Sequence, residues 1–554
     1  MSMAMKTDQA EVVALRDPDL VMRLSRMGSA HPMRLSFLRV LLRRVIREGW
    51  HFDRPVWDMD GHGVGRAVYR VRGPERTYSL VAFAHDLPDD MRSDRVIATA
   101  WDATFALVDG EPTQADLDRL AANVPLQEAG RISGKELALS RANRSVRLFS
   151  HVVDRLSRGL QPDAAEIDAV GYLMRTTAVY GSGKFGAADR EDTCERAELK
   201  APFQAEMLSV WLTRAFTVDI AEHLARVQGG TVAVRLDPAL RRRLGVGNST
   251  GLGMAPFLVR HPALLNSWMT ARETALARVR ALPHAAPTEI AAFRNALAAA
   301  RDNADLWHSD HPAQIAKLTD LRADLAQLAD HVVSGWDHEG SQPWNLLWQW
   351  GEAQLSEEGQ ECLLALLLEP QRAVVDDLAD TLDVDEATRF AIDGAMTVGR
   401  FKTLMAQDYG WTNKFAFTDP ERSARFWYVS EEKLEPRLGD RRAESGHERE
   451  QPLGIAQAVA ALSETLTSWP EAEALARFLL VHPEHRHTVR RIQMLQSLPY
   501  AEIRDNLLDA GMLPIDILRC KLAFFGATRF DPRSDRWVRI SLFQGMPFPD
   551  EMSV

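Results

Sequence analysis

The feature that most constrains the fold is a change in hydrophobic periodicity along the chain. Between residues 66 and 108, three segments alternate apolar and polar residues or run apolar with β-branched and aromatic side chains, as strands do. From about residue 113 onward, apolar residues recur mostly at helical spacing. No regular alternation of strand and helix follows, which argues against a doubly wound parallel sheet. The sequence therefore predicts a small antiparallel sheet followed by a large helical body.

The predicted strands form a meander, since turn-forming residues separate them. They span residues 66–72, 77–85 and 95–108, and a last strand, 536–543, is expected to return to the same sheet. Residues 12–50 are predicted to be helical. The helices predicted for the body are 136–158, 163–180, 201–227, 262–282, 286–303, 311–335, 343–368 and 384–407.

These elements give the predicted fold class: mainly α, with a multi-helix bundle body and a small N-terminal α+β element that contains the antiparallel sheet. A chain of 554 residues is too long for one hydrophobic core and suggests several domains. The predicted divisions are an N-terminal α+β element (1–125), a helical body (126–430), a charged linker (431–452) and a C-terminal helical part with a terminal strand (453–554).

Composition limits the classes of function. The cysteines Cys194, Cys362 and Cys520 lie far apart and form no CxxC pair, which argues against a disulfide framework and a thiolate zinc site. No stretch has the apolar core of a signal peptide or the length of a membrane span. A net charge of −11 disfavours binding to nucleic acid. We therefore expect a cytoplasmic protein that binds neither nucleic acid nor membranes.

The glycine-rich segment RRRLGVGNSTGLGMAPF, residues 241–257, is the first candidate site. Its glycines leave backbone N–H groups accessible, and a helical turn is expected to follow, so the segment suits an anion. In this interpretation Asn248, Ser249 and Thr250 hold the anion, and Arg243 supports it with a planar fork of donors. The segment matches neither the phosphate loop GxxxxGK[ST] nor the dinucleotide motif GxGxxG after a strand.

Two other interpretations of this segment stay open. GNSTG matches the GxSxG turn that carries the nucleophile of α/β-hydrolases, but the surrounding sequence lacks the parallel sheet which that turn needs. The segment is also explained as a flexible hinge between a helix that ends near Leu244 and one that begins at Pro262, since glycines adopt positive φ without steric cost.

A second glycine-rich segment, VYGSGKFGAADREDTCERAELK, spans residues 179–200. Lys184 is a candidate anion partner or base, Tyr180 a candidate acid, and Ser182 a further donor to substrate. The alternative is that Gly181 ends the preceding helix and the remainder is a surface loop. If the two segments meet in space, they line one site for an anion.

Two further patterns have structural explanations. His308 and His311, and the group His482, His485 and His487, lack the HExxH spacing of a zinc helix, so no metal site is predicted. A tryptophan-rich segment, 334–354, is typical of core packing, although a stacking surface for an aromatic ligand is the alternative.

The leading hypothesis is an enzyme that acts on a small carboxylate or phosphorylated metabolite by acid–base chemistry of the lyase or isomerase kind. Lys184 and Tyr180 are its acid–base candidates, and we expect a homo-oligomer formed through a helical face. A non-catalytic helical scaffold that acts through the tryptophan-rich segment or the linker is the alternative, and a flavin- or acyl-CoA-dependent helical enzyme is a third. The sequence leaves the cofactor unknown.

Overall fold

The computed structural model describes residues 13–552, except for 89–90, 92–99, 126–132, 177–195, 251–261, 310–311, 383–389, 415–453, 505–513 and 529–537. The chain forms two compact units. The sheet unit consists of Ser36–Thr250, Phe525–Asp531 and Val538–Val554, and the helical unit consists of Met1–Leu35, Gly251–Phe524 and Pro532–Trp537. The predicted linker, 431–452, lies outside the described residues.

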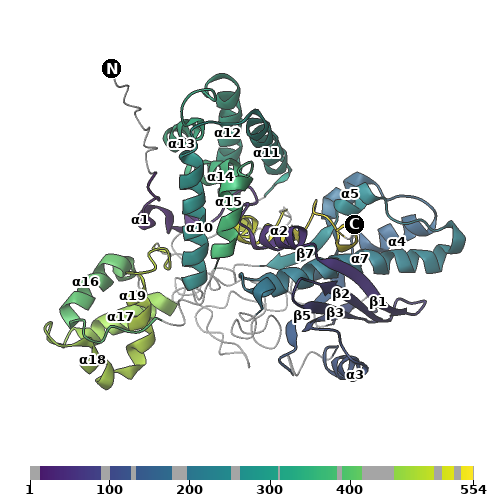
Figure 1. Cartoon of the computed structure of the whole chain (residues 1–554), viewed down its shortest axis with the longest axis horizontal. Coiled ribbons are helices and arrows are strands. Elements are labelled where there is room, and N and C mark those ends of the chain that lie inside the picture. Colours follow the sequence, from purple (N-terminus) through teal and green to yellow (C-terminus); the bar gives the residue numbers. More distant parts are fainter. Residues whose placement is uncertain are drawn as a thin grey trace, which may run out of the picture. The chain divides into compact units, whose positions relative to one another are not determined.

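An eight-stranded, curled, mixed sheet forms the centre of the sheet unit (Figure 1). The strands lie in the order in which they occur in the sequence, and every pair of neighbours is antiparallel except β6 and β7, which are parallel. They are β1 (His51–Met59), β2 (Gly65–Arg72), β3 (Thr77–Ala84), β4 (Ala103–Asp109), β5 (Glu136–Arg144), β6 (Tyr172–Thr176), β7 (Gly245–Thr250) and β8 (Val538–Leu542). The predicted return of the last strand to this sheet is confirmed.

The predicted fold class is wrong, because this sheet is much larger than a small antiparallel element on a mainly helical protein. Residues 136–144 and 172–176 form β5 and β6, although both lie in segments predicted to be helices. Both strands are buried on both faces and therefore lack the alternation of a half-exposed strand. Short apolar runs of this kind do not distinguish a strand from a buried helix.

Helix α7 (Gln204–Gly229) is the long central helix of the sheet unit (Figure 1). Most of its residues are buried, as expected for a helix that is apolar on nearly all sides. It contacts β3 to β7 and also packs against α2 (Phe37–Glu48) and α4 (Phe149–Ser157). Phe216 of α7 makes edge contacts with Tyr69 and Phe105, which fixes the sheet face that α7 covers.

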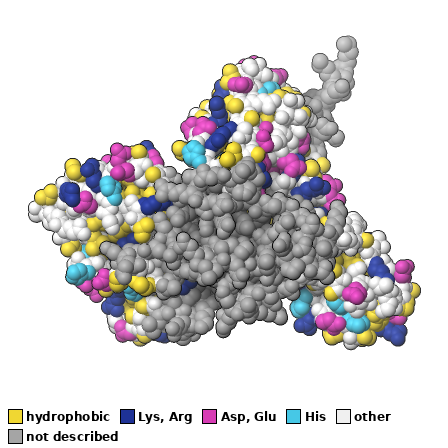
Figure 2. Space-filling view, turned by 180° about the vertical axis from the view of Figure 1, so that it is seen from behind, with side chains coloured by type: hydrophobic (Ala, Val, Ile, Leu, Met, Phe, Trp, Pro, Cys, Tyr) yellow, Lys and Arg dark blue, Asp and Glu magenta, His cyan; other side chains and the backbone are white. Residues whose placement is uncertain are grey.

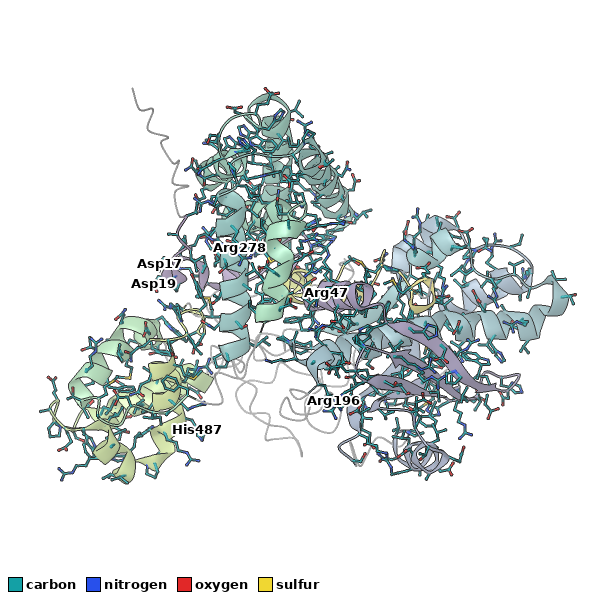
Figure 3. All side chains as sticks on the ribbon, in the orientation of Figure 1. Asp17, Asp19, Arg47, Arg196, Arg278 and His487 are labelled. Atoms are coloured by element: carbon teal, nitrogen blue, oxygen red, sulfur yellow. The ribbon has the colours of Figure 1, made fainter. Side chains whose placement is uncertain are left out.

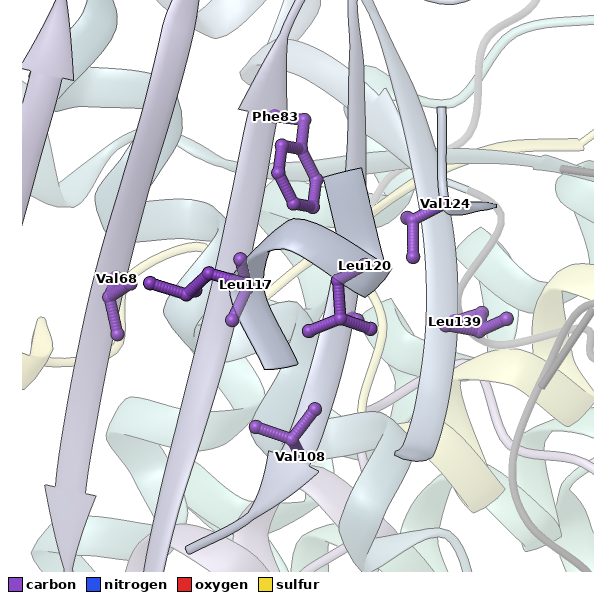
Figure 4. Packing of buried hydrophobic residues seen from close by; sticks show 9 residues of the cluster. Val68, Phe83, Val108, Leu117, Leu120, Val124 and Leu139 are labelled. Carbon is purple, nitrogen blue, oxygen red and sulfur yellow. The ribbon is translucent and has the colours of Figure 1, made fainter. Parts of the chain in front are cut away.

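Helix α3 (Gln114–Asn123) covers the opposite face of the sheet. Its Leu117 and Leu120 pack on Val68, Phe83 and other strand residues, as Figure 4 shows. Val68 and Ala106 are the sequence neighbours of Tyr69 and Phe105, and successive strand residues point to opposite faces. The short helices α5 (Ala164–Val170) and α8 (Pro238–Arg242) complete the described helices of this unit.

Thr113 caps the N-terminus of α3, and its loss should have a modest, measurable effect. The hydroxyl of Thr113 accepts a hydrogen bond from the backbone N–H of Asp116 at 3.2 Å, and the Asp116 side chain accepts one in return from the N–H of Thr113 at 3.0 Å. We expect Thr113→Ala to lower the free energy of unfolding by about 1 kcal/mol. Thr113→Ser retains the cap and serves as the control, with urea midpoints as the measurement. Equal midpoints for the two variants would contradict this role.

The helical unit contains one described bundle built from α10 to α15 and a second group built from α16 to α19 (Figure 1). The bundle helices are α10 (Pro262–Arg280), α11 (Pro287–Leu306), α12 (Pro312–Ser334), α13 (Pro343–Gln354), α14 (Glu357–Leu368) and α15 (Arg372–Val375). The second group comprises α16 (Val398–Tyr409), α17 (Gly454–Leu466), α18 (Leu475–Val481) and α19 (Arg486–Met494). The helices α1 (Pro18–Val21) and α20 (Pro514–Cys520) also belong to this unit.

The bundle follows the sequence prediction closely. Helices α10, α11 and α12 lie within a few residues of their predicted bounds, and each begins at a proline, where the missing N–H has no helical partner to lose. The predicted helix 343–368 is divided at Leu355 and Ser356, because the Ser356 hydroxyl caps a new helix by accepting the N–H of Gly359. Figure 3 shows Arg278 on α10, and its guanidinium pairs with Asp377 at 2.8 Å.

The tryptophan-rich segment is part of the bundle core, which confirms the packing interpretation. Trp344 and Trp348 are fully buried, and the indole N–H of Trp336 donates to the carbonyl of Pro343 at 2.8 Å. Trp350 stacks on His331, with ring centroids 3.9 Å apart.

Among the described residues, no helix is both long enough and apolar enough to cross a membrane.

A cluster of buried charges lies inside the helical unit. Both carboxylate oxygens of Glu273 accept from Arg16, at 2.7 and 3.0 Å, and Arg16 also donates to Glu361 at 2.8 and 3.2 Å. Arg272, which is fully buried, donates to Glu273 at 2.8 Å, and Arg26 donates to Glu361 at 3.0 Å. These pairs connect the N-terminal segment of the unit to α10 and α14. Each buried charge in the cluster has a partner of opposite charge, as burial requires.

Candidate functional site

The structure describes only part of the sites predicted from the two glycine-rich segments. Tyr180, Ser182 and Lys184 lie outside the described residues, as do the side chains of Ser249 and Thr250. The backbone of residues 245–250 forms strand β7, so this part of the first segment is neither a loop nor a hinge. The sequence GVGNST suggests a loop because glycines are typical of turns. In the structure, Gly245 packs closely against β8 and Gly247 against β6, so both glycines belong to a strand.

Arg243 and Asn248 are described, and they do not share a site. Arg243 is half exposed and forms a surface ion pair with Asp168 of α5. Asn248 is buried in β7, and its amide Nδ2 donates to the carbonyl of Thr176 in β6 at 2.8 Å. Arg243 comes before β7, and Asn248 is the fourth residue of this strand. At about 3.3 Å per residue, about 10 Å of strand separates Asn248 from Gly245, the first residue of β7.

The ends of β6 and β7 are nevertheless neighbours. The two strands are parallel and paired, and the hydrogen bond from Asn248 to Thr176 joins them near their C-terminal ends. The chain continues into each glycine-rich segment from one of these ends, so it leaves β6 and β7 on the same side of the sheet. The structure thus brings Thr176 and Asn248 together, just before residues 177–195 and 251–261, which lie outside the described residues.

A cavity of about 290 Å³ on the α7 face of the sheet is the candidate site supported by described side chains. We call it the α7 cavity. It lies between β1 and β2 on one side and the outward face of α7 on the other, and α8 and the C-terminal 3₁₀ turn η12 (Pro549–Glu551) contribute to its wall. Four polar residues of α7, Asp219, Glu222, His223 and Arg226, line it. Their spacing of three, four and seven residues places them on one helix face.

A β-bulge in the edge strand β1 shapes the opposite wall. Asp53 pairs with Arg70 and Val56 with Val68, so β1 contains one residue more than β2 in this interval. The extra residue reverses the side-chain alternation, and therefore Phe52 and Trp57 both point to the α7 face. Pro55 lies inside the bulge, where the lack of an N–H costs no ladder hydrogen bond.

Asp219 is held by donors from both strands that line the cavity. The Tyr69 hydroxyl and the Arg54 guanidinium each donate to its Oδ2 at 2.6 Å. Burial, together with the charge of Asp219, raises the pKa of Tyr69 well above its usual value, so this phenol remains a donor. Arg54 also lies over the Trp57 ring, 4.4 Å from its centroid. These contacts fix Asp219 between two strands of the sheet.

Glu222 lies one turn away in a different environment. Its side chain is 13% exposed, and its Oε1 accepts the backbone N–H of Leu236 at 3.1 Å. Burial raises the pKa of Glu222, and the nearby charge of Asp219 adds to the rise, while the hydrogen bond from Leu236 opposes it. The cavity therefore combines a carboxylate that accepts from two donors with a second carboxyl group whose pKa is raised by burial.

His223 supports the wall of the cavity through contacts at both of its ring nitrogens. The Trp57 indole N–H can only donate, and it points at Nδ1 of His223 across 3.4 Å. The Asp60 carbonyl can only accept, and it lies 2.7 Å from Nε2. In the tautomer that fits both partners, the ring accepts at Nδ1 and donates at Nε2. This contact attaches the β1–β2 hairpin turn, where Asp60 lies, to α7.

Two arginines at the cavity have side chains open to solvent. Arg226 is exposed, and no carboxylate of the described residues forms an ion pair with it. Arg235 is 83% exposed and approaches Glu222 only to 3.9 Å. Guanidinium groups in this state are available to an anion that enters the cavity.

Sequence reasoning missed these residues, although one signal was present. Helix 201–227 was predicted, and within it the residues of DIAEHLAR that are not apolar recur three, four and seven positions after Asp219. A polar stripe on an otherwise apolar helix indicates either a solvated face or a site. Arg54 and Trp57 gave no such signal, because the bulge and Pro55 interrupt the alternation of β1.

The described residues contain no group of three His, Cys, Asp or Glu side chains arranged to hold a metal ion. Comparisons of the chain with models of protein families, with curated proteins and with solved structures find no match. The chemistry of the α7 cavity is therefore the basis for inferring function.

Proposed function

We propose that the α7 cavity binds a small anionic compound and acts on it by acid–base chemistry, of the lyase or isomerase kind. The observation that carries the proposal is the pair Asp219 and Glu222, which lie on one face of α7 in contrasting environments. Two carboxyl groups whose environments differ in this way suit the separate roles of proton donor and ionised partner. This proposal replaces Lys184 and Tyr180 with described residues in those roles.

Glu222 is the proton-transferring group in this proposal. Its raised pKa allows the protonated form to persist closer to neutral pH, which is the condition for an efficient general acid. Asp219, held by Tyr69 and Arg54, stabilises positive charge that develops on the bound compound. Arg226 and Arg235, which are open to solvent, attract the anionic compound to the cavity. A cavity of about 290 Å³ is at the small end of ligand sites and suits a metabolite rather than a polymer.

A ligand screen by thermal shift tests this proposal. The probes are dicarboxylates, sugar phosphates, acyl-CoA esters, flavins and nicotinamide cofactors, which also cover the cofactor-dependent alternatives. A ligand at about 100 times its dissociation constant stabilises the folded protein by about 2.7 kcal/mol. We expect one anion class to raise the midpoint, and we expect Arg226→Ala to remove that shift.

Turnover of the compound found in this way then tests the role of Glu222. We expect Glu222→Gln to lower kcat by about 10²- to 10⁴-fold with little change in binding. Wild-type kcat should fall as pH rises through the pKa of Glu222, because the acid form is lost. The matched controls are Arg301→Ala and Asp302→Asn, two exposed residues of α11 outside the cavity. Full activity of Glu222→Gln would show that the assignment is wrong.

The expectations about location and partners remain proposals. Cys362 and Cys520 are buried free thiols, which supports a reducing, cytoplasmic environment. On the face shown in Figure 2, basic and acidic side chains of the described residues are interspersed. The net charge of −11 remains the basis for proposing no nucleic-acid partner. Self-association through a helical face is tested by light scattering after size exclusion. The burial of Trp344 and Trp348 removes the tryptophan surface on which the scaffold alternative partly depended.

A further inference from the structure

The side chain of Arg241 forms a carboxylate-binding fork in the wall of the α7 cavity. Its Nη1 and Nη2 donate to the two carboxylate oxygens of Asp550 at 2.7 and 2.9 Å. The guanidinium lies over the buried ring of Phe548, 4.0 Å from its centroid, and the side chain is only 16% exposed. Phe548 supports the guanidinium from one side, so the side chain of Arg241 keeps a contact that does not involve Asp550.

Asp550 is held much less firmly than Arg241. Its side chain is 61% exposed, and an ion pair with one partner so open to water contributes little stability. The C-terminal segment around it is anchored by other contacts. The Trp211 indole donates to the carbonyl of Pro547 at 2.9 Å, and the Glu551 carboxylate accepts the N–H of Phe548 at 2.8 Å. The Asp550 carboxylate can therefore leave the fork while the segment stays in place.

Arginines outnumber carboxyl groups in the lining of the cavity, which favours the entry of an anion. The described lining contains five arginines and four carboxylates, namely Arg54, Arg70, Arg226, Arg235 and Arg241 with Asp53, Asp219, Glu222 and Asp550. Arg54 is committed to Asp219, and Arg70 to Asp53 and Glu111. A ligand carboxylate that displaces Asp550 takes over the same planar, two-bond geometry, and the exposed Asp550 side chain turns to solvent.

We propose that the ligand of the α7 cavity is a small carboxylate compound and that its carboxylate binds the Arg241 fork in place of Asp550. Asp550 thus acts as an internal competitor that occupies the anion position of the empty site. This inference rests on the proposed function, and it narrows the anion to a carboxylate. The fork binds a carboxylate, that of Asp550, in the structure. A phosphate can also accept two hydrogen bonds from one guanidinium, so the titration below compares the two anions directly.

Calorimetric titration tests the competition. The probes are pyruvate, succinate and benzoate, with benzamide and inorganic phosphate as mismatched compounds. We expect Asp550→Ala to tighten binding of at least one carboxylate by about 3- to 10-fold and to leave benzamide and phosphate unchanged. We expect Arg241→Lys, which keeps the charge but not the fork, to weaken the same carboxylate at least 10-fold. Thermal unfolding verifies that each variant is folded.

The matched control is Asp168→Asn, which removes the exposed partner of Arg243 at an ion pair outside the cavity. It should leave all affinities unchanged. Three results would each overturn the inference. Asp550→Ala binds carboxylates no more tightly than wild type does, or it binds phosphate more tightly. The third is that Asp550→Ala binds no carboxylate at 20-fold molar excess and millimolar concentration. Loss of binding in Arg226→Ala with no effect of Asp550→Ala or Arg241→Lys would retain the proposed function and reject the competition. Normal turnover by Glu222→Gln with a clear Asp550 effect would reject the proposed acid–base role and retain the competition.

Discussion

Glu361→Gln is expected to lower the free energy of unfolding of the helical unit by about 3–5 kcal/mol, since removal of one partner leaves buried charges uncompensated. Glu361 is fully buried and receives hydrogen bonds from Arg16 and Arg26. Faster amide hydrogen exchange in peptides from α10 and α14 is the measurement. Glu357→Gln is the matched control on the same helix, because Glu357 is half exposed and pairs with Arg26 only at 3.5 Å. It should cost less than about 1 kcal/mol.

The same cluster gives a pH dependence with a definite sign. Burial by itself raises the carboxyl pKa, but the charges of Arg16 and Arg272 and the hydrogen bonds of Arg16 outweigh it and lower the pKa of Glu361 to about 2. The resulting stability is fully present above the ordinary value of 4.5 and is lost as the pH falls toward 2. Acid unfolding of wild type should therefore be steeper than that of Glu361→Gln. Identical acid profiles would contradict this assignment.

Arg214→Met is expected to destabilise the sheet unit by about 2–4 kcal/mol, because several buried or partly buried carbonyl groups lose their donors at about 1 kcal/mol or more each. Arg214 of α7 is fully buried and donates to the carbonyl oxygens of Leu244 and Met546 at 2.7 Å each. It thereby joins the start of β7 to the C-terminal segment. Urea unfolding gives the cost, and hydrogen exchange should rise in residues 543–552.

The control for Arg214 is Arg242→Met, which removes a half-exposed guanidinium whose pair with Glu551 spans 3.4 Å. Glu551 belongs to the same C-terminal segment. Comparing the two substitutions therefore separates the effect of the carbonyl contacts of Arg214 from that of the exposed ion pair of Arg242. We expect Arg242→Met to change stability by less than about 1 kcal/mol. Equal effects of the two substitutions would show that the carbonyl contacts of Arg214 do not anchor the segment.

The parts of the fold that were predicted from the sequence are those in which local pattern and burial agree. Helices α10, α11 and α12 have an apolar stripe and a proline at the start, and strands β2 and β3 have turn residues on both sides. The strands β5 and β6 were predicted as helices, because burial on both faces removed their alternation. Strand β1 was missed because its bulge shifts the pattern by one residue at Pro55.

The candidate site was less predictable than the fold for a physical reason. Asp219 and Glu222 lie on a helix that was predicted, but their environments depend on Tyr69, Arg54 and the N–H of Leu236, which come from other parts of the chain. Asp550 reaches Arg241 from more than 300 positions away. Residue spacing does not reveal such contacts, because tertiary folding alone determines them.

The position of β8 in the sheet has a consequence for how the protein is made. Strands β1 to β7 precede most of the helical unit in the sequence, and β8 follows it after about 290 residues. At a synthesis rate of 5–20 residues per second, a ribosome needs about 15–60 s to pass from β7 to β8. Throughout this interval the nascent chain carries β7 as an unpaired sheet edge, which is the kind of surface that chaperones protect from aggregation. The sheet is thus completed only after nearly all of the helical unit has been synthesised.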